Sequence, residues 1–169
     1  MSFKLYFRKS SFKKDLNSAK ILLQEIENYA PKSFLEIGVF QGVTSRNVCE
    51  KLNIIHEGKF KYIGIDLFED TDEKIDLKES TSKHNHFSNP FKHILYNIIL
   101  KKDLHSINSV KDLLKKFNNN VDLIKGFSHE ALKKVNLSEV EFVFLDGGHA
   151  YETVKEDLRI ILKDIKKNM

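Results

Sequence analysis

The chain of 169 residues has one cysteine, two prolines and no tryptophan, and it contains no long apolar run. A single cysteine, Cys49, cannot form a disulfide within the chain. No stretch approaches the roughly 18 consecutive apolar residues of a membrane-spanning helix. The N-terminus carries a charge every few residues, unlike a secretory signal peptide. These absences predict a cytoplasmic chain with no membrane partner.

The chain also lacks a dense basic tract, although it is basic overall. Its 28 lysines and arginines outnumber its 24 acids, which gives a formal net charge of +4. The lysines are spread over every expected helix and are accompanied by acids, a pattern typical of solvated helix faces. A nucleic-acid partner is therefore not expected.

Short apolar runs alternate with amphipathic segments along most of the chain. Because the runs are apolar on both faces, they predict an α/β fold, a parallel sheet with helices on both sides. Four strands are recognisable, at 33–37, 62–66, 121–124 and 141–146. We expect an N-terminal arm over 1–14 and one domain over 15–169.

The expected helices are marked by apolar residues at helical spacing. They cover 15–29, 43 to about 52, 110–117 and 151–166, with a short helix capped by Ser128. In the last long helix we expect an apolar face turned inward, made of Val154, Leu158, Ile161, Leu162 and Ile165, and Tyr151 is also expected to pack.

A polar insertion at about 67–105 interrupts this alternation and has the composition of a lid. Residues 67–90 do not indicate an immediate helix. Its acidic run is expected to be solvated, and its histidines are expected to lie on the surface rather than bind a metal. The run comprises Glu69, Asp70, Asp72 and Glu73; the histidines are His84, His86, His93 and His105.

Glycine is scarce, yet it is concentrated where expected strands end. The first strand continues as Glu36-Ile-Gly38-Val-Phe-Gln-Gly42, followed by Thr44 and Ser45, which can cap a helix. Glycines in a strand-to-helix turn let a ligand approach the backbone. A dinucleotide fingerprint would have glycine where Glu36 stands. The turn therefore predicts a nucleotide-like ligand, and its spacing argues against NAD.

The other strand ends carry polar residues too. Asp66 closes the second strand, where a carboxylate can accept two hydrogen bonds from a ribose diol. A helix N-cap is the alternative role for Asp66. Gly126 to Ser128 follow the third strand, and Asp146 to His149 follow the fourth. In an open parallel sheet, ligands bind beyond these carboxyl ends.

The Glu-x-Gly-x-x-x-Gly turn, Asp66 and the stretch Asp146-Gly-Gly-His-Ala-Tyr151 together resemble class I S-adenosylmethionine-dependent methyltransferases. The second stretch resembles one branch of small-molecule O-methyltransferases, which includes metal-assisted sugar methyltransferases. The resemblance covers residues 15 to 167 and implies a Rossmann-like sheet.

The resemblance also implies roles for individual residues. Glu36, Gly38 and Gly42 would face the methionine part of S-adenosylmethionine, and Asp66 would hold its ribose. Phe127 and Ser128 would border the adenine. Asp146 would face the transfer site, as a ligand of Mg²⁺ in metal-dependent members, and His149 would be the general base. For His149, a helix-capping role is the alternative.

Members of that family continue with further C-terminal strands, which are absent here, so the sheet is expected to be C-terminally short. The fourth strand would then be an apolar edge, which two copies could cover by forming a homodimer. The sequence favours methylation of a small-molecule or sugar hydroxyl. The alternatives are a non-catalytic or truncated cofactor-binding partner subunit and, less favoured, an NAD-dependent oxidoreductase.

Overall fold

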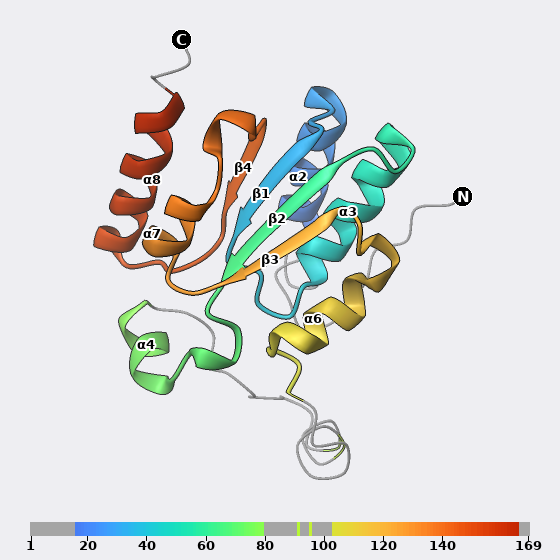
Figure 1. The fold of residues 1–169 in the computed structure, drawn as a ribbon. Coiled ribbons are helices and arrows are strands. Elements are labelled where there is room, and N and C mark those ends of the chain that lie inside the picture. Colours follow the sequence, from blue (N-terminus) through green and yellow to red (C-terminus); the bar gives the residue numbers. More distant parts are fainter. Residues whose placement is uncertain (1–15, 80–90, 92–94, 96–102, 166–169) are drawn as a thin grey trace.

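A computed structural model describes residues 16–79, 91, 95 and 103–165 of the chain (Figure 1). The expected arm at 1–14, much of the expected lid and the histidines His84, His86 and His93 lie outside the described residues. The main elements follow in the order α2 (Leu16–Tyr29), β1 (Ser33–Ile37), α3 (Val43–His56), β2 (Lys61–Asp66), α4 (Glu73–Lys78), α6 (Ile107–Leu114), β3 (Val121–Lys125), α7 (Ser128–Ala131), β4 (Phe142–Leu145) and α8 (Tyr151–Ile165).

The four strands form one parallel sheet in the order β3-β2-β1-β4. Leu35 of β1 lies between Ile63 of β2 and Val143 of β4, so the first strand is central. All four carboxyl ends therefore meet at one edge of the sheet. The predicted α/β fold with four parallel strands is confirmed.

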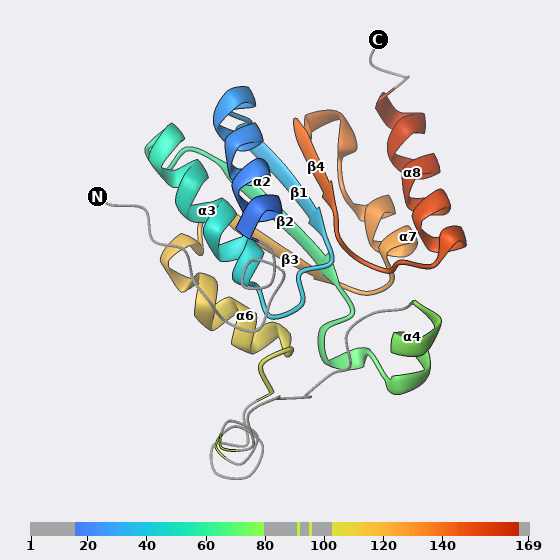
Figure 2. The ribbon, with the colours of Figure 1, turned by 180° about the vertical axis from the view of Figure 1, so that it is seen from behind.

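Helices cover both faces of the sheet (Figures 1 and 2). On one face, Phe34 and Tyr62 pack in a core that α2, α3 and α6 complete. On the other face, Leu35 and Ile63 pack in a core with residues of α7 and α8. Neighbouring residues of β1 thus enter two different cores, which explains why Phe34 and Leu35 are both apolar.

Helix α8 presents a different face to the core than its sequence indicates. Ile161 is buried, as expected, but Asp157 is buried beside it. The expected inward residues Val154, Leu158 and Leu162 are 37%, 40% and 51% exposed, and Tyr151 is 73% exposed. The apolar arc of α8 is wider than its contact with the sheet, and half of it faces outward.

Strand β4 occupies an edge of the described sheet, as the sequence predicts. Its outer side has no strand partner among the described residues. The exposed residues of α8 belong to the helix that follows this strand. The homodimer expected across this edge stays a prediction.

None of the described helices has the length and apolar character that crossing a lipid bilayer requires.

Candidate functional site

In the turn between β1 and α3, every second residue from Gly38 to Gly42 has a positive φ angle. Gly38, Phe40 and Gly42 all have positive φ, at 96°, 53° and 71°. Gly42 is the N-cap of α3 and supplies no capping side chain. The predicted capping by Ser45 is wrong, because its hydroxyl donates to Glu36 instead, 2.8 Å away. The first turn of α3 therefore directs backbone N–H groups toward the carboxyl edge of the sheet.

Gly38 lies against the end of β4. A Cβ atom on Gly38 would come within 2.2 Å of the backbone oxygen of Asp146. Its N–H donates to the carbonyl oxygen of Ile65 over 2.9 Å. Gly38 thus brings the turn after β1, the end of β2 and the loop after β4 together, which only glycine permits at this position.

Asp66, at the end of β2, is bonded to the same turn. One carboxylate oxygen accepts from the N–H of Phe40 and the other from the N–H of Phe68, both over 2.8 Å. The second contact is the cap-like role that the sequence left open for this residue. A carboxylate accepts about four hydrogen bonds, so the two N–H groups leave capacity for a diol.

Glu36 is completely buried under α3. One of its oxygens accepts from the hydroxyls of Ser45 and Tyr62, whereas Oε1 has no hydrogen-bond partner among the described residues. The pKa of this carboxyl is raised to about 8, mainly by burial and to a smaller extent by Asp146 and Asp66, against the lowering effect of the two hydroxyls. Glu36 is therefore a buried acid with one unused oxygen at the end of β1.

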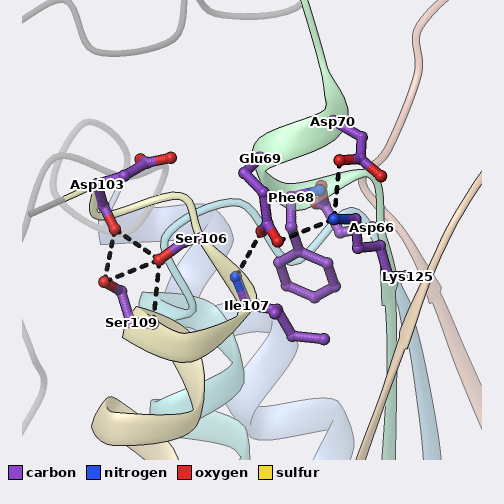
Figure 3. A network of polar contacts seen from close by, with 9 residues as sticks. All are labelled: Asp66, Phe68, Glu69, Asp70, Asp103, Ser106, Ile107, Ser109 and Lys125. Atoms are coloured by element: carbon purple, nitrogen blue, oxygen red, sulfur yellow. Dashed lines mark hydrogen bonds and ion pairs between the residues drawn. The ribbon is translucent and has the colours of Figure 1, made fainter.

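The acids of the segment after Asp66 connect it to β3 and α6 (Figure 3). Lys125, at the end of β3, lies 2.8 Å from a Glu69 oxygen and 2.7 Å from an Asp70 oxygen. The other Glu69 oxygen accepts from the N–H of Ile107 at the start of α6. These contacts hold the pKa of Glu69 down at about 2. Glu69, Asp70 and Asp72 are exposed, as the predicted solvated run requires, but Glu69 and Asp70 also pair with Lys125 and Asp72 caps α4.

The expectation of no immediate helix after Asp66 is wrong. Phe68–Asp70 form a 3-10 helix, and Phe68 is buried. The segment therefore turns back onto the sheet and borders the carboxyl edge.

His105 was expected on the surface but is only 2% exposed. Its ring lies edge-on to Phe40, with centroids 4.4 Å apart, and its Nε2 lies 3.1 Å from Nε2 of Gln41. Sequence reasoning missed this residue because Gln41 lies 64 positions earlier. His105 supports the turn after β1 from outside.

The residue that follows β3, Gly126, has free space beside it. Gly126 has φ 143°, and a Cβ atom there would meet nothing within 4 Å. Phe127 is 47% exposed and serves as the N-cap of α7, so the predicted N-cap role of Ser128 is wrong. The hydroxyl of Ser128 contacts Asp157 instead. An exposed aromatic ring beside an open glycine is compatible with stacking of a planar base.

The loop after β4 carries the two expected catalytic residues, Asp146 and His149, and both are exposed. Partial desolvation raises the pKa of Asp146, and the nearby His149 opposes that rise. The structure therefore brings these two side chains together at the carboxyl edge.

Glu79, which the sequence analysis did not single out, holds this loop. Its carbonyl oxygen accepts from the N–H of His149 over 2.9 Å. Its carboxylate accepts from the hydroxyl of Thr153 over 3.0 Å and from the N–H of Ala150 over 3.4 Å. A Cβ atom on Gly148 would lie 2.4 Å from the carboxylate. Its position 70 residues upstream gives no sequence signal for this contact.

The residues at this edge fit an adenosine cofactor better than a metal ion. The glycine turn, Asp66, the unpartnered oxygen of Glu36 and the exposed Phe127 supply sites for a cationic chain, a ribose and a base. Within the part of the chain that the structure describes, no three acids, histidines or cysteines are grouped closely enough to hold a metal. Asp146 alone does not fit Mg²⁺, which is bound through several oxygen ligands.

Comparisons with known proteins agree with this fold. A family model described as "Methyltransferase domain" matches residues 35–168. No curated protein matches the chain.

Solved structures share the architecture at low sequence identity. The SAH-bound methyltransferase PaMTH1 of Podospora anserina is 17% identical, with a TM-score of 0.55 over 87% of this chain and 46% of its own. A protein assigned as an O-methyltransferase from Klebsiella pneumoniae is 14% identical, with a TM-score of 0.56 over 91% of this chain and 53% of its own. CalS11, a calicheamicin methyltransferase, is 17% identical, with a TM-score of 0.53 over 89% of this chain and 59% of its own. The chain thus spans about half the length of these proteins, and the similarity concerns the fold.

Proposed function

The chain belongs to the methyltransferase domain family, and from that premise we propose that it binds S-adenosylmethionine and transfers its methyl group to a hydroxyl of a small molecule, such as a sugar. The observation that carries this proposal is the bond between Asp66 and the N–H of Phe40. It supports the proposal because it holds Asp66, which would bind the ribose, directly beside the glycine turn.

On the donor side, each part of the cofactor has a group of matching chemistry. Gly38 and Gly42 let the methionine chain approach the backbone, and Glu36 supplies an oxygen for its cationic end. Asp66 would accept from the ribose hydroxyls. Phe127 would pack against the adenine, with Ser128 beside it.

On the acceptor side, Asp146 and His149 face the same edge. Methyl transfer is an in-line displacement: an acceptor oxygen forms the new C–O bond while the S–C bond breaks and its electrons stay on sulfur. The rate depends mainly on holding the two reactants in line. His149 would take the hydroxyl proton, a role that suits an imidazole because its ordinary pKa lies near neutrality.

No step is routed through Mg²⁺, because Asp146 has no grouped partner ligands in the described ranges. Two alternatives differ from this proposal in measurable ways. A non-catalytic partner subunit would bind S-adenosylmethionine without turnover, and an oxidoreductase would bind NAD. Against NAD, the side chain of Glu36 occupies the position where the dinucleotide fingerprint has glycine.

Titration calorimetry with S-adenosylmethionine, S-adenosylhomocysteine and NAD tests donor binding. We expect the first two to bind and NAD not to bind. Transfer is then tested with radiolabelled methyl donor and a panel of phenols, catechols and sugars. His149→Ala should keep donor binding and lose transfer. His56→Ala, at a histidine that ends α3 and contacts the carbonyl oxygen of Pro31, should keep both. Absence of binding by the intact chain contradicts the proposal; binding without transfer to any acceptor favours the partner subunit.

A further inference from the structure

Glu36 has an unusual environment for an acid. It is completely buried, yet no lysine, arginine or histidine pairs with it among the described residues. Two hydroxyls, from Ser45 and Tyr62, share one oxygen, and the other oxygen is unpartnered. An isolated charge in such a place is costly, so a buried carboxyl without a counter-charge favours its neutral form.

The charged and titratable groups around Glu36 come from three elements. From β2 come Tyr62 and Asp66; from the loop after β4 comes Asp146; from α3 comes the buried thiol of Cys49. The one nearby cation of α3, Arg46, is directed to Glu50 and to the carbonyl oxygen of Leu113.

The two aspartates share a consequence for the site. Both aspartates disfavour a negative charge on Glu36. Together with burial they raise its pKa to about 8, so the Glu36 carboxyl is mostly protonated at neutral pH. A cation brought among three carboxyl groups would reverse that preference, because an opposite charge within about 4–6 Å lowers a carboxyl pKa by one to three units.

We infer that Glu36 is a counter-charge formed only on donor binding: it is neutral in the free chain and releases its proton to solvent when the cationic end of S-adenosylmethionine enters the site. This inference rests on the proposed function and concerns how that site selects its ligand. The bond that breaks is the carboxyl O–H, and the proton is taken up by buffer. The cationic end is the α-ammonium group of the methionine chain, so S-adenosylhomocysteine, which carries the same group, should release a similar number of protons.

Calorimetry in buffers of different ionisation enthalpy measures the number of protons released. At pH 7, a group with a pKa of about 8 is about nine-tenths protonated. A fall of one to three units in that pKa would release about 0.4 to 0.9 proton per S-adenosylmethionine from Glu36. Near pH 10 the number should fall to zero. S-adenosylhomocysteine at pH 7 should give a similar number, because it carries the same ammonium end.

The α-amino group of the ligand also titrates near neutrality, so the comparison with Glu36→Gln isolates the protein's proton. At pH 7 this variant should release about 0.4 to 0.9 proton fewer on binding than the parent chain. Glu25→Gln, on the exposed surface of α2, should match the parent chain. Equal proton numbers for the parent and Glu36→Gln would overturn the inference while leaving the proposed function in place; no binding by the parent would overturn both.

Infrared difference spectroscopy provides a second measurement on the unsubstituted chain, in case Glu36→Gln does not fold. The band of a protonated carboxyl should be present without ligand and lost when S-adenosylmethionine is added. A band unchanged by saturating ligand would overturn the inference.

Discussion

The N–H of Phe40 donates to Asp66 over 2.8 Å and so joins the turn after β1 to the end of β2. Removing the carboxylate takes away this bond, the bond to Phe68 and the proposed ribose contact together. We expect Asp66→Ala to weaken S-adenosylhomocysteine binding by at least roughly tenfold to a hundredfold, since hydrogen bonds to charged groups contribute about 1.5–3 kcal/mol each. Calorimetry measures this loss.

The matched control for that variant is Asp122→Ala, at an exposed aspartate of β3. It should leave the affinity unchanged. An unchanged affinity in Asp66→Ala would instead mean that this acid only caps the segment after β2.

A second prediction concerns Gly38 and its contact with the end of β4. An alanine there would have φ near 96° and a Cβ atom 2.2 Å from the backbone of Asp146, which cannot move aside as a side chain would. Gly126→Ala is the matched comparison, because its φ is also positive but its surroundings are open. Urea unfolding should show a loss of about 1–2 kcal/mol for Gly126→Ala and a clearly larger loss for Gly38→Ala. Equal losses would contradict the close packing.

The pairing of Glu79 with the loop after β4 gives a coupling that can be measured. Gly148→Ala places a methyl group 2.4 Å from the Glu79 carboxylate, so it should destabilise the chain by about 1–3 kcal/mol. Adding Glu79→Ala removes the obstructing group. The double variant should therefore lose less stability than the sum of the two single variants, which a double-mutant cycle detects. Additive losses would mean that Glu79 does not contact this loop.

The strands and the ends that carry the site could be predicted because both signals are local. A buried parallel strand needs only a few consecutive apolar residues, and the glycine or acid that ends it follows at once. This is why Glu36, Gly38, Asp66 and Asp146 were found from the sequence and lie along one edge.

The residues that were missed or misplaced depend on distant contacts. His105 is buried because it packs against Phe40 and Gln41, and Glu79 matters because it contacts Thr153. In α8, periodicity marks an apolar arc but not which part of that arc meets the sheet. The buried Asp157 could not be foreseen, because its contact with Ser128 forms only in the folded chain.

The outward residues of α8 sharpen the homodimer prediction. Val154 and Leu162 lie four positions before and after Leu158, so two antiparallel copies of α8 centred on Leu158 would pair Val154 with Leu162. If this dimer forms, sedimentation should give a dimer for the parent chain and a monomer for Leu158→Glu.

Ile21→Glu is the control for that variant, because Ile21 is 63% exposed on α2, on the other face of the sheet. It should sediment like the parent. A parent chain that stays monomeric at all concentrations would contradict the homodimer.

Glu36 should also make the stability of the ligand-free chain depend on pH. Its pKa is about 8 in the folded chain and 4.5 when unperturbed, so folding favours the protonated form. The stability that protonated Glu36 contributes to the folded chain is fully present below about pH 4.5. It declines as the pH rises and is lost as the pH passes through 8. Glu36→Gln keeps a neutral group at this place. Between pH 5 and pH 9 the parent should therefore lose free energy of unfolding that Glu36→Gln keeps, so the difference between the two should change in favour of the variant. Urea unfolding at each pH measures this difference. A constant difference across this range would mean that Glu36 is already ionised in the free chain, and it would remove the proton that donor binding is inferred to release.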